Sequence, residues 1–233
     1  MSEAAGEHVA LLKQWLEEWG VSLPGEQTAA LVRLGEDVAA EAERWAVSGV
    51  AGTEENLRRN ILDSLLALSA PEWAGEGEAV DVGSGGGFPG LALALAEPDR
   101  RWWLLEATRK KAAFLAREAS ALGVGGRVHV VWGRAEDRRT WRPLDHDAVW
   151  PGRFARVTAR AVAPLRRLVP WVAALPERPG GLFFAYKGPG AEQELQEARA
   201  SLRRERLELV RVVEARLPRG GEIRRLLVFR AEG

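Results

Sequence analysis

The 233 residues predict an α/β protein: a mostly parallel sheet with an antiparallel edge hairpin, preceded by an N-terminal helical extension. Helical periodicity dominates the first 70 residues, whereas short apolar strands alternate with helical segments from residue 78 onward. Such alternation is typical of a parallel sheet covered by helices. With 46% hydrophobic residues, the chain can bury a sizeable core. We expect an N-terminal helical cap over 1–70 and a sheet domain over 71–233.

The cap is expected to hold three helices. Apolar residues recur at helical spacing over 9–20, 24–45 and 53–68. Gly20 ends the first of these segments, and a break at 48–52 precedes the third. Thr53 is a suitable N-cap for the third helix, because Glu54 and Glu55 follow it in the first turn.

The sheet domain is expected to contain strands separated mostly by helices. The strands are predicted at 79–82, 102–105, 128–132, 154–158, 182–186, 209–217 and 223–229. The helices are predicted at 89–96, 108–122, 164–175 and 191–206, with a further short helix near Glu136. The turn at 218–221 is short enough to join the last two strands as a hairpin. Together these features indicate a Rossmann-like sheet with an antiparallel edge.

The composition excludes several classes of protein. The chain has no cysteine, which excludes a disulfide scaffold, a cysteine nucleophile, a thiolate zinc site and an iron–sulfur cluster. Its longest wholly apolar run, 91–96, is far shorter than a membrane span. Acidic residues stand near the N-terminus, where a signal peptide carries basic ones. We therefore expect a cytoplasmic protein with no membrane attachment and no metal site.

The formal charge of zero is divided unevenly along the chain. Residues 1–78 carry 5 basic and 15 acidic side chains, whereas residues 100–233 carry 28 basic and 15 acidic ones. The C-terminal part is therefore able to attract a polyanion. Arginine accounts for 29 of the 33 basic residues. Arginine suits bidentate phosphate contacts, although a GC-rich genome would give the same ratio of arginine to lysine.

A glycine-rich loop follows the first predicted strand and leads into a helix. From Asp81 to Gly90 it reads DVGSGGGFPG. Gly83, Gly85 and Gly87 allow backbone N–H groups to approach a ligand closely, beside the N-terminus of that helix. The acidic residue just before the first glycine gives the pattern D-x-G-x-G-x-G, which occurs in methyltransferases that use S-adenosylmethionine. The loop therefore predicts a binding site for that nucleoside cofactor.

An NAD-dependent oxidoreductase is the first alternative. Gly85-x-Gly87-x-x-Gly90 also matches the dinucleotide-binding fingerprint. The register is unfavourable, because the loop begins at Gly83 and its sixth position is then Phe88. A dinucleotide-binding fold requires Gly or Ala there for close packing of the helix.

Further residues at the expected strand ends fit a nucleoside. Glu106 ends the second predicted strand, where a carboxylate can accept hydrogen bonds from the ribose hydroxyls of either cofactor. Ala135 and Glu136 follow the third strand, where an adenine edge would lie. Arg160 follows the fourth strand and is a candidate clamp for the donor carboxylate or for a phosphate.

Five segments, taken in order, make the chain similar to a known family. They are NILDSL at 60–65, the loop at 81–90 with its GFPG, GRAE at 133–136, TARA at 158–161 and YKG at 186–188. They resemble the glucose-inhibited division protein B family of bacterial small-subunit (16S) ribosomal RNA methyltransferases, which methylate N7 of a guanine. The similarity covers nearly the whole chain.

The resemblance implies a class I methyltransferase sheet and a set of contacts with the methyl donor. These contacts fall at Gly83, Phe88, Ala135, Glu136 and Arg160, with Glu106 near the donor ribose. The chain departs from the family at two positions: Asn60 stands where many members carry His, and Ala159 stands where Ser is commoner. No role is therefore assigned to Asn60 or Asp63.

The residues themselves narrow the acceptor atom. Methylation of a pyrimidine C5 requires a cysteine, and there is none. Methylation of an exocyclic amine usually relies on an Asn/Asp-Pro-Pro-aromatic segment after the fourth strand, where this chain reads TARA. Guanine N7 has a free lone pair and loses no proton. Alignment, worth about 7–11 kcal/mol, can then drive the transfer, so we expect no catalytic general base.

Several basic residues are candidate RNA contacts, because RNA binding combines phosphate neutralisation with stacking on unpaired bases. They are Arg138, Arg139, Arg142, Arg166, Arg167 and Lys187. The expected function is S-adenosylmethionine-dependent methylation of guanine N7 in small-subunit rRNA. The expected partner is that rRNA or a ribosomal subunit particle, with no obligate protein partner. The second alternative is a non-enzymatic rRNA-binding assembly factor with a vestigial donor fold.

Overall fold

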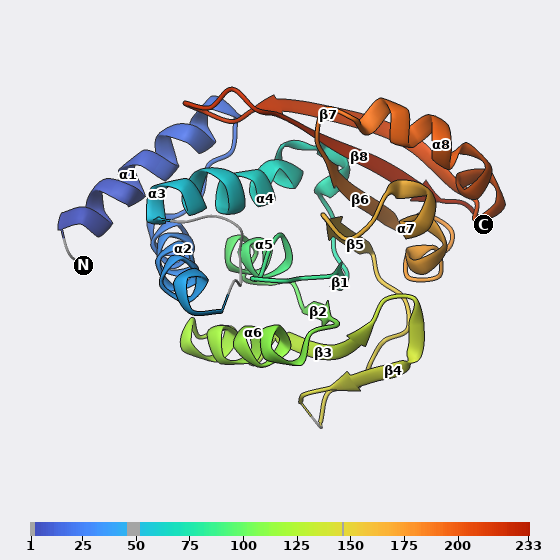
Figure 1. Ribbon diagram of the computed structural model, residues 1–233, viewed down its shortest axis with the longest axis horizontal. Helices are drawn as coiled ribbons and strands as arrows, with labels where there is room; N and C mark the ends of the chain where they lie inside the picture. The colour runs from blue at the N-terminus through green and yellow to red at the C-terminus, as the bar shows by residue number, and fades with distance from the viewer. Residues whose placement is uncertain (1–2, 46–51, 146) are drawn as a thin grey trace.

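In the computed structural model, which describes residues 3–45, 52–145 and 147–233, the chain forms an eight-stranded sheet with helices on both faces (Figure 1). The strands are β1 (Ala79–Val82), β2 (Trp102–Glu106), β3 (Val128–Arg134), β4 (Asp137–Pro143), β5 (Arg156–Arg160), β6 (Leu182–Lys187), β7 (Leu207–Arg216) and β8 (Ile223–Ala231). Their order is β4-β3-β2-β1-β5-β6-β8-β7. The neighbouring strands β3, β2, β1, β5 and β6 are parallel to one another, and β8 pairs antiparallel with β6 and β7. The predicted sheet with its antiparallel edge hairpin is confirmed.

The N-terminal cap consists of two long helices and a third segment of mixed helical type. The long helices are α1 (Glu3–Glu18) and α2 (Gly25–Trp45). The third segment comprises α3 (Thr53–Asn56), the π-helix η1 (Leu57–Leu62), α4 (Asp63–Leu65) and the 3-10 helix η2 (Leu66–Ser69), and a further 3-10 helix, η3 (Pro71–Trp73), follows the cap. The break predicted at 48–52 lies almost wholly outside the described residues. A π-helix shifts carbonyl groups out of the regular pattern and is frequent at functional sites.

Two buried apolar clusters lie on opposite faces of the sheet. The first joins the cap to α5 (Gly90–Ala96) and α6 (Arg109–Ala121), and it includes Leu34, Ile61 and Leu91. The second joins α7 (Leu165–Val172) and α8 (Ala191–Arg204) to the other face, and it includes Leu168 and Leu202. Because cap residues share the first cluster with the sheet, the cap packs directly on that face (Figure 1).

One predicted element is wrong. In place of a short helix near Glu136, residues 137–143 form β4, which pairs antiparallel with β3 and adds a second antiparallel edge. Gly133 permits this close pairing, because a Cβ there would lie 2.8 Å from the Cα of Trp141. The indole Nε1–H of Trp141 donates to the carbonyl oxygen of Arg134. The contacts across the hairpin therefore outweigh the local helix signal.

The strand order reverses between β1 and β5, which places two loops against each other. Open α/β sheets bind ligands at such a switch point, outside the carboxyl ends of the strands. The loop after β1 contacts the loop after β5 so closely that a Cβ on Gly83 would lie 2.6 Å from Val162 Cγ2. Gly83 also has a φ of +75°. Both facts require glycine at this position.

Asp81 holds the glycine loop from beneath. Its side chain is fully buried. Oδ2 accepts the backbone N–H of Gly90 at 3.1 Å, and Oδ1 accepts the hydroxyl hydrogen of Thr158 at 2.8 Å. Burial raises the pKa of Asp81 from 3.8 to about 6, against the opposing effect of these hydrogen bonds. The carboxyl group therefore holds the loop in place, but burying it costs more folding free energy when it is ionised than when it is protonated.

We expect Asp81 to lower stability as the pH rises. Its pKa is higher in the folded protein than in the unfolded chain, so its favourable contribution is complete below about 3.8 and is lost as the pH passes about 6. Urea denaturation measures the unfolding free energy of wild type and of Asp81→Asn. Between pH 4 and pH 7.5, the stability of the variant relative to wild type should rise by roughly 2–3 kcal/mol. A difference independent of pH would contradict this expectation.

Candidate functional site

Two adjoining cavities open at the carboxyl edge of the sheet. The smaller, about 170 Å³, is lined by Gly83, Leu105, Glu106, Ala107, Gly133, Ala135, Glu136 and Val162. The larger, about 730 Å³, is lined by Arg59, Asn60, Asp63, residues 160–164, Tyr186, Lys187, Gly188, Glu194 and Arg224. Val162 lines both, so the two cavities meet at this side chain. A third cavity, about 800 Å³, lies at the amino ends of β1, β2 and β3, where sheets of this type do not bind ligands.

Among the residues that the structure describes, Glu106 is the one carboxylate that both lines the smaller cavity and holds the glycine loop. It is 6% exposed. Its Oε2 accepts the backbone N–H of Gly85 at 2.9 Å, and its Oε1 accepts that of Thr108 at 2.7 Å. Each oxygen keeps a further lone pair for a ligand. A rigid carboxylate among apolar walls suits a vicinal diol on a flat, largely apolar nucleoside.

The residues predicted to bind the donor fall into two groups. Gly83, Glu106, Ala135 and Glu136 line the smaller cavity. The other five do not belong to its lining: Asp81, Gly85, Gly87, Phe88 and Arg160, of which Arg160 lines the larger cavity instead. Gly85 and Gly87 carry φ values of +55° and +101° in the turn above the buried Asp81. The sequence pattern therefore marks the loop but does not separate its lining from its supports.

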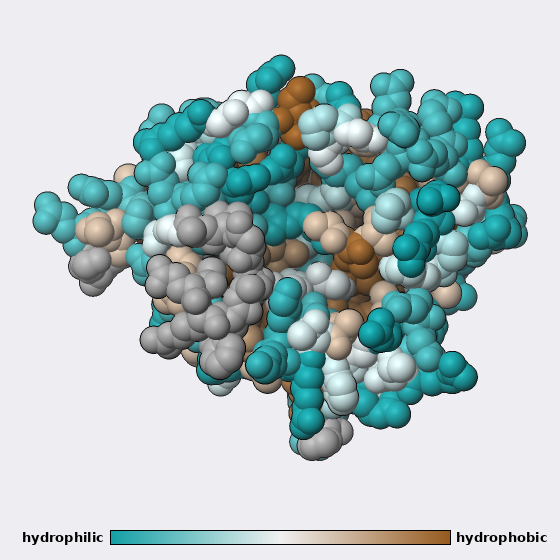
Figure 2. Space-filling view, in the orientation of Figure 1, coloured by the Kyte–Doolittle hydropathy of each residue, from teal (hydrophilic) through white to brown (hydrophobic). Residues whose placement is uncertain are grey.

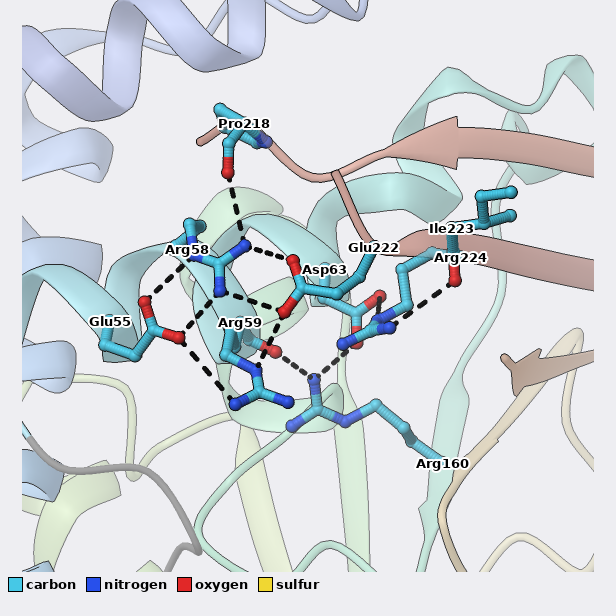
Figure 3. A network of polar contacts seen from close by, with 9 residues as sticks. All are labelled: Glu55, Arg58, Arg59, Asp63, Arg160, Pro218, Glu222, Ile223 and Arg224. Carbon is cyan, nitrogen blue, oxygen red and sulfur yellow. Dashed lines mark hydrogen bonds and ion pairs between the residues drawn. The ribbon is translucent and has the colours of Figure 1, made fainter. Parts of the chain in front are cut away.

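Arg160 extends from the end of β5 into the cap (Figure 3). Its Nη1 donates to Asp63 Oδ2 at 2.9 Å and to the carbonyl oxygen of Arg59 at 3.2 Å. Its Nη2 donates to Asn60 Oδ1 at 2.8 Å. Arg59 and Asn60 lie in η1, where the π-helix leaves carbonyl groups available, and Asp63 is the first residue of α4. On its other side, the guanidinium carbon lies 5.4 Å from the centre of the Phe88 ring. Arg160 thus joins the cap, β5 and the glycine loop.

Asp63 lies between two guanidinium groups. Besides Arg160, the Nε of Arg224 from β8 lies 3.3 Å from Asp63 Oδ1 (Figure 3). The residue is 4% exposed. Sequence reasoning assigned no role to Asp63 and counted Arg224 only as one basic residue of the C-terminal part, without its contact with Asp63. The one available signal was the family-like segment at 60–65, which contains Asp63.

A second ionic contact ties the cap to the edge hairpin. Arg58 in η1 donates to Glu222 and to Glu55, and also to the carbonyl oxygen of Pro218 at 3.2 Å (Figure 3). The hydrogen bonds from Arg58 lower the pKa of Glu222 to about 2, and its partners Glu55 and Glu222 raise the pKa of Arg58. The turn between β7 and β8 is therefore fixed over the cap at neutral pH.

Lys187, a predicted RNA contact, lines the larger cavity in an ion pair. Its Nζ donates to Glu194 Oε2 at 2.8 Å and to the carbonyl oxygen of Ala163 at 3.0 Å. The same Glu194 oxygen accepts the backbone N–H of Leu165 at 2.7 Å. The neighbouring Tyr186 hydroxyl donates to the carbonyl oxygen of Ser64 at 2.6 Å, and burial raises its pKa well above 10. Sequence reasoning missed Glu194, which carries no local motif.

The other predicted RNA contacts lie on the surface, outside both cavities. Arg138, Arg139 and Arg142 are exposed on β4, and Arg166 and Arg167 are exposed on α7. The guanidinium of Arg138 lies over the Trp141 ring, and that of Arg167 lies over the Trp171 ring. Figure 2 shows a mainly hydrophilic face in which more apolar side chains gather in a central hollow. Exposed arginines therefore lie on β4, which follows the 133–136 wall of the smaller cavity, and on α7, which follows the 160–164 wall of the larger one.

Neither a metal centre nor a membrane span is found in the part of the chain that the structure describes. There, no group of three or more His, Asp or Glu side chains could hold a metal ion. None of the helices described combines the length and the apolar character needed to cross a bilayer.

Solved structures share the fold at low sequence identity. An O-methyltransferase from Bacillus cereus in complex with SAH matches with a TM-score of 0.60 and 16% identity, covering 97% of this chain and 99% of that one. The [4+2]-cyclase SpnF matches with a TM-score of 0.57 and 15% identity, covering 91% of this chain and 98% of that one. Because the second protein is named as a cyclase, the fold alone does not give the activity.

Sequence comparison gives the family. Proteins named ribosomal RNA small subunit methyltransferase G are 32% identical in Moorella thermoacetica and 34% identical in Symbiobacterium thermophilum, each over 95% of this chain and 89% of the relative. The relative of the same name from Sorangium cellulosum is 39% identical over 83% of this chain and 78% of its own length. The family model of rRNA small subunit methyltransferase G matches residues 27–223. The chain therefore belongs to the GidB family and is a small-subunit rRNA methyltransferase.

Proposed function

We propose that the chain transfers the methyl group of S-adenosylmethionine to N7 of a guanine in small-subunit rRNA, leaving 7-methylguanosine. The observation that carries this proposal is the meeting of the two cavities at Val162. The smaller has the features of a nucleoside site, and the larger is rich in cationic groups. A donor in the first would then adjoin an acceptor base in the second. The oxidoreductase and the non-enzymatic assembly factor find no support in the family.

The residues of the smaller cavity fit the methyl donor. Glu106 would accept the ribose hydroxyls with its remaining lone pairs, and Ala135 and Glu136 would lie along the adenine. Gly83 leaves the backbone open to close approach beside Val162. When bound, the donor supplies an electrophilic methyl group on a positively charged sulfur. Arg160 would position the glycine loop through its contact with Phe88 and would not bind the donor directly, because its Nη1 and Nη2 donate to Asp63 and Asn60 of the cap.

The larger cavity favours an acceptor that needs no deprotonation. Among its described residues, Asp63 is paired with two guanidinium groups and Lys187 is paired with Glu194. Tyr186 stays protonated, because its pKa is raised well above 10 and its hydroxyl is bound to the main chain. Guanine N7 attacks through a lone pair and releases no proton, so orientation by these fixed groups is sufficient.

The remaining charges fit an RNA strand at the mouth of this site. Arg59 and Arg224 line the larger cavity, and Arg59 has a side chain that is 41% exposed. With the exposed arginines of β4 and α7, they would neutralise phosphates on either side of the target nucleotide. We propose that the substrate is the rRNA itself or a small-subunit particle in the cytoplasm, and that no obligate protein partner is required.

Glu106→Gln should weaken binding of S-adenosylmethionine on the order of 10-fold. The substitution replaces one charged carboxylate oxygen, which accepts hydrogen bonds, by an amide group that donates them. Isothermal titration calorimetry measures this change. Glu208→Gln, on an exposed position of β7, is the matched control and should bind the donor as wild type does. Equal affinities for all three proteins would exclude Glu106 from the donor site.

The protein should transfer tritiated methyl groups to small-subunit rRNA that lacks the modification. Mapping alkali-labile N7-methylguanosine before and after the reaction should then show a new methylated guanine. Gly83→Ala should reduce this transfer on the order of 10-fold or more, since the added Cβ would meet Val162 and the backbone has a positive φ. Methyl transfer to a different base atom would refute the proposed acceptor.

A further inference from the structure

We infer that Lys187 and Glu194 form a pair that selects guanine by its Watson–Crick edge in the larger cavity. This inference rests on the proposed function, because it assumes that the acceptor base enters this cavity. Both side chains line the cavity, and they come from different elements, the end of β6 and the first turn of α8. The family-like segments contain Lys187 but not Glu194.

The pair is rigid and still has one donor and one acceptor to offer. Glu194 Oε2 accepts two hydrogen bonds, from Lys187 Nζ and from the backbone N–H of Leu165. Its Oε1 has no partner among the described residues, so both lone pairs of that oxygen remain. Lys187 Nζ uses two of its three hydrogens, on Glu194 and on the carbonyl oxygen of Ala163. The third hydrogen remains for a ligand.

This arrangement matches guanine and opposes adenine. The Watson–Crick edge of guanine presents the O6 acceptor next to the N1–H and N2–H donors. Lys187 would donate to O6, while Glu194 Oε1 would accept from N1–H and N2–H. Adenine presents an amino donor next to the N1 acceptor, so each of its groups would face a group of the same kind. Uracil supplies one N–H in this position, where guanine supplies two.

Other polar groups of the cavity are less suited to this task. Asp63 is 4% exposed, and a guanidinium nitrogen lies beside each of its two oxygens. Asn60 Oδ1 accepts from Arg160, and its Nδ2 donates to Asn56 Oδ1. Asp63 Oδ1 has no hydrogen-bond partner, but it is buried beside the Nε of Arg224, whereas Glu194 is partly exposed and its Oε1 has no charged neighbour among the described residues.

The pair is also held by the loop that separates the two cavities. The contacts to Ala163 and Leu165 fix Lys187 and Glu194 to the segment that follows Val162. That segment begins at Ala161, a non-glycine residue with a φ of +56°. Such a conformation is uncommon and persists where the surroundings enforce it. A base held by this pair is therefore set at a fixed distance from the donor cavity.

The test compares two RNAs that differ in one exocyclic group. Small-subunit RNA is assembled with guanine or with inosine, which lacks the 2-amino group, at the nucleotide mapped above. Single-turnover methyl transfer is measured for wild type, Glu194→Gln, Lys187→Met and the control Glu192→Gln. Glu192 is exposed on the first turn of the same helix and lies outside the cavity lining. Donor binding is measured in parallel by calorimetry.

Wild type and Glu192→Gln should prefer guanine to inosine roughly 10-fold, because one hydrogen bond to a charged oxygen is lost. Glu194→Gln places an amide donor against N1–H. It should therefore react on the order of 10- to 100-fold more slowly with guanine and should lose the preference over inosine. Its affinity for the donor should stay unchanged. Lys187→Met should slow both RNAs by the same factor, because inosine keeps O6.

Two results would overturn the inference while the proposed function stands: equal rates of wild type on both RNAs, or a wild-type preference for guanine in Glu194→Gln. If Glu194→Gln fails to fold, Lys187→Met decides, since undiminished rates on both RNAs would contradict the pair. Absence of methyl transfer by wild type to guanine-containing rRNA would instead refute the proposed function.

Discussion

The contact between Arg160 and Asp63 joins parts of the chain that are 97 residues apart, and the shape of the site depends on it. Arg160 binds η1 of the cap on one side and stacks on Phe88 of the glycine loop on the other. Without Arg160, Asp63 would keep Arg224 as its one remaining cationic partner among the described residues. Removing one partner from a buried ion pair costs about 3–5 kcal/mol. The larger cavity takes walls from the same elements, so its geometry follows from this contact.

The ionisable groups at the sheet edge serve mainly to fix positions. Asp81 holds the glycine loop, Glu106 holds two backbone N–H groups, and Asp63 separates two arginines. Tyr186 is bound to the main chain of the cap. Groups committed in this way orient ligands and set the local electrostatics. Such a site agrees with an acceptor that attacks through an available lone pair.

Local sequence signals predicted most of the fold and about half of the lining of the smaller cavity. Strand ends and turn glycines are readable because they depend on neighbours in sequence, which is why Gly83 and Glu106 were found. β4 was missed because its pairing depends on Trp141 across a hairpin. Glu194 and the contact of Arg224 with Asp63 were missed for the same kind of reason: the partners lie on different elements and leave no local pattern.

Amide hydrogen exchange of Arg160→Ala tests most directly whether one arginine joins the cap to the glycine loop. Faster exchange than in wild type is predicted over residues 57–65 and 84–90, with β7 and β8 unchanged, because Arg160 contacts the first two segments and not the hairpin strands. Unchanged exchange in both segments would show that the cap and the loop keep their positions without Arg160, and would contradict this account.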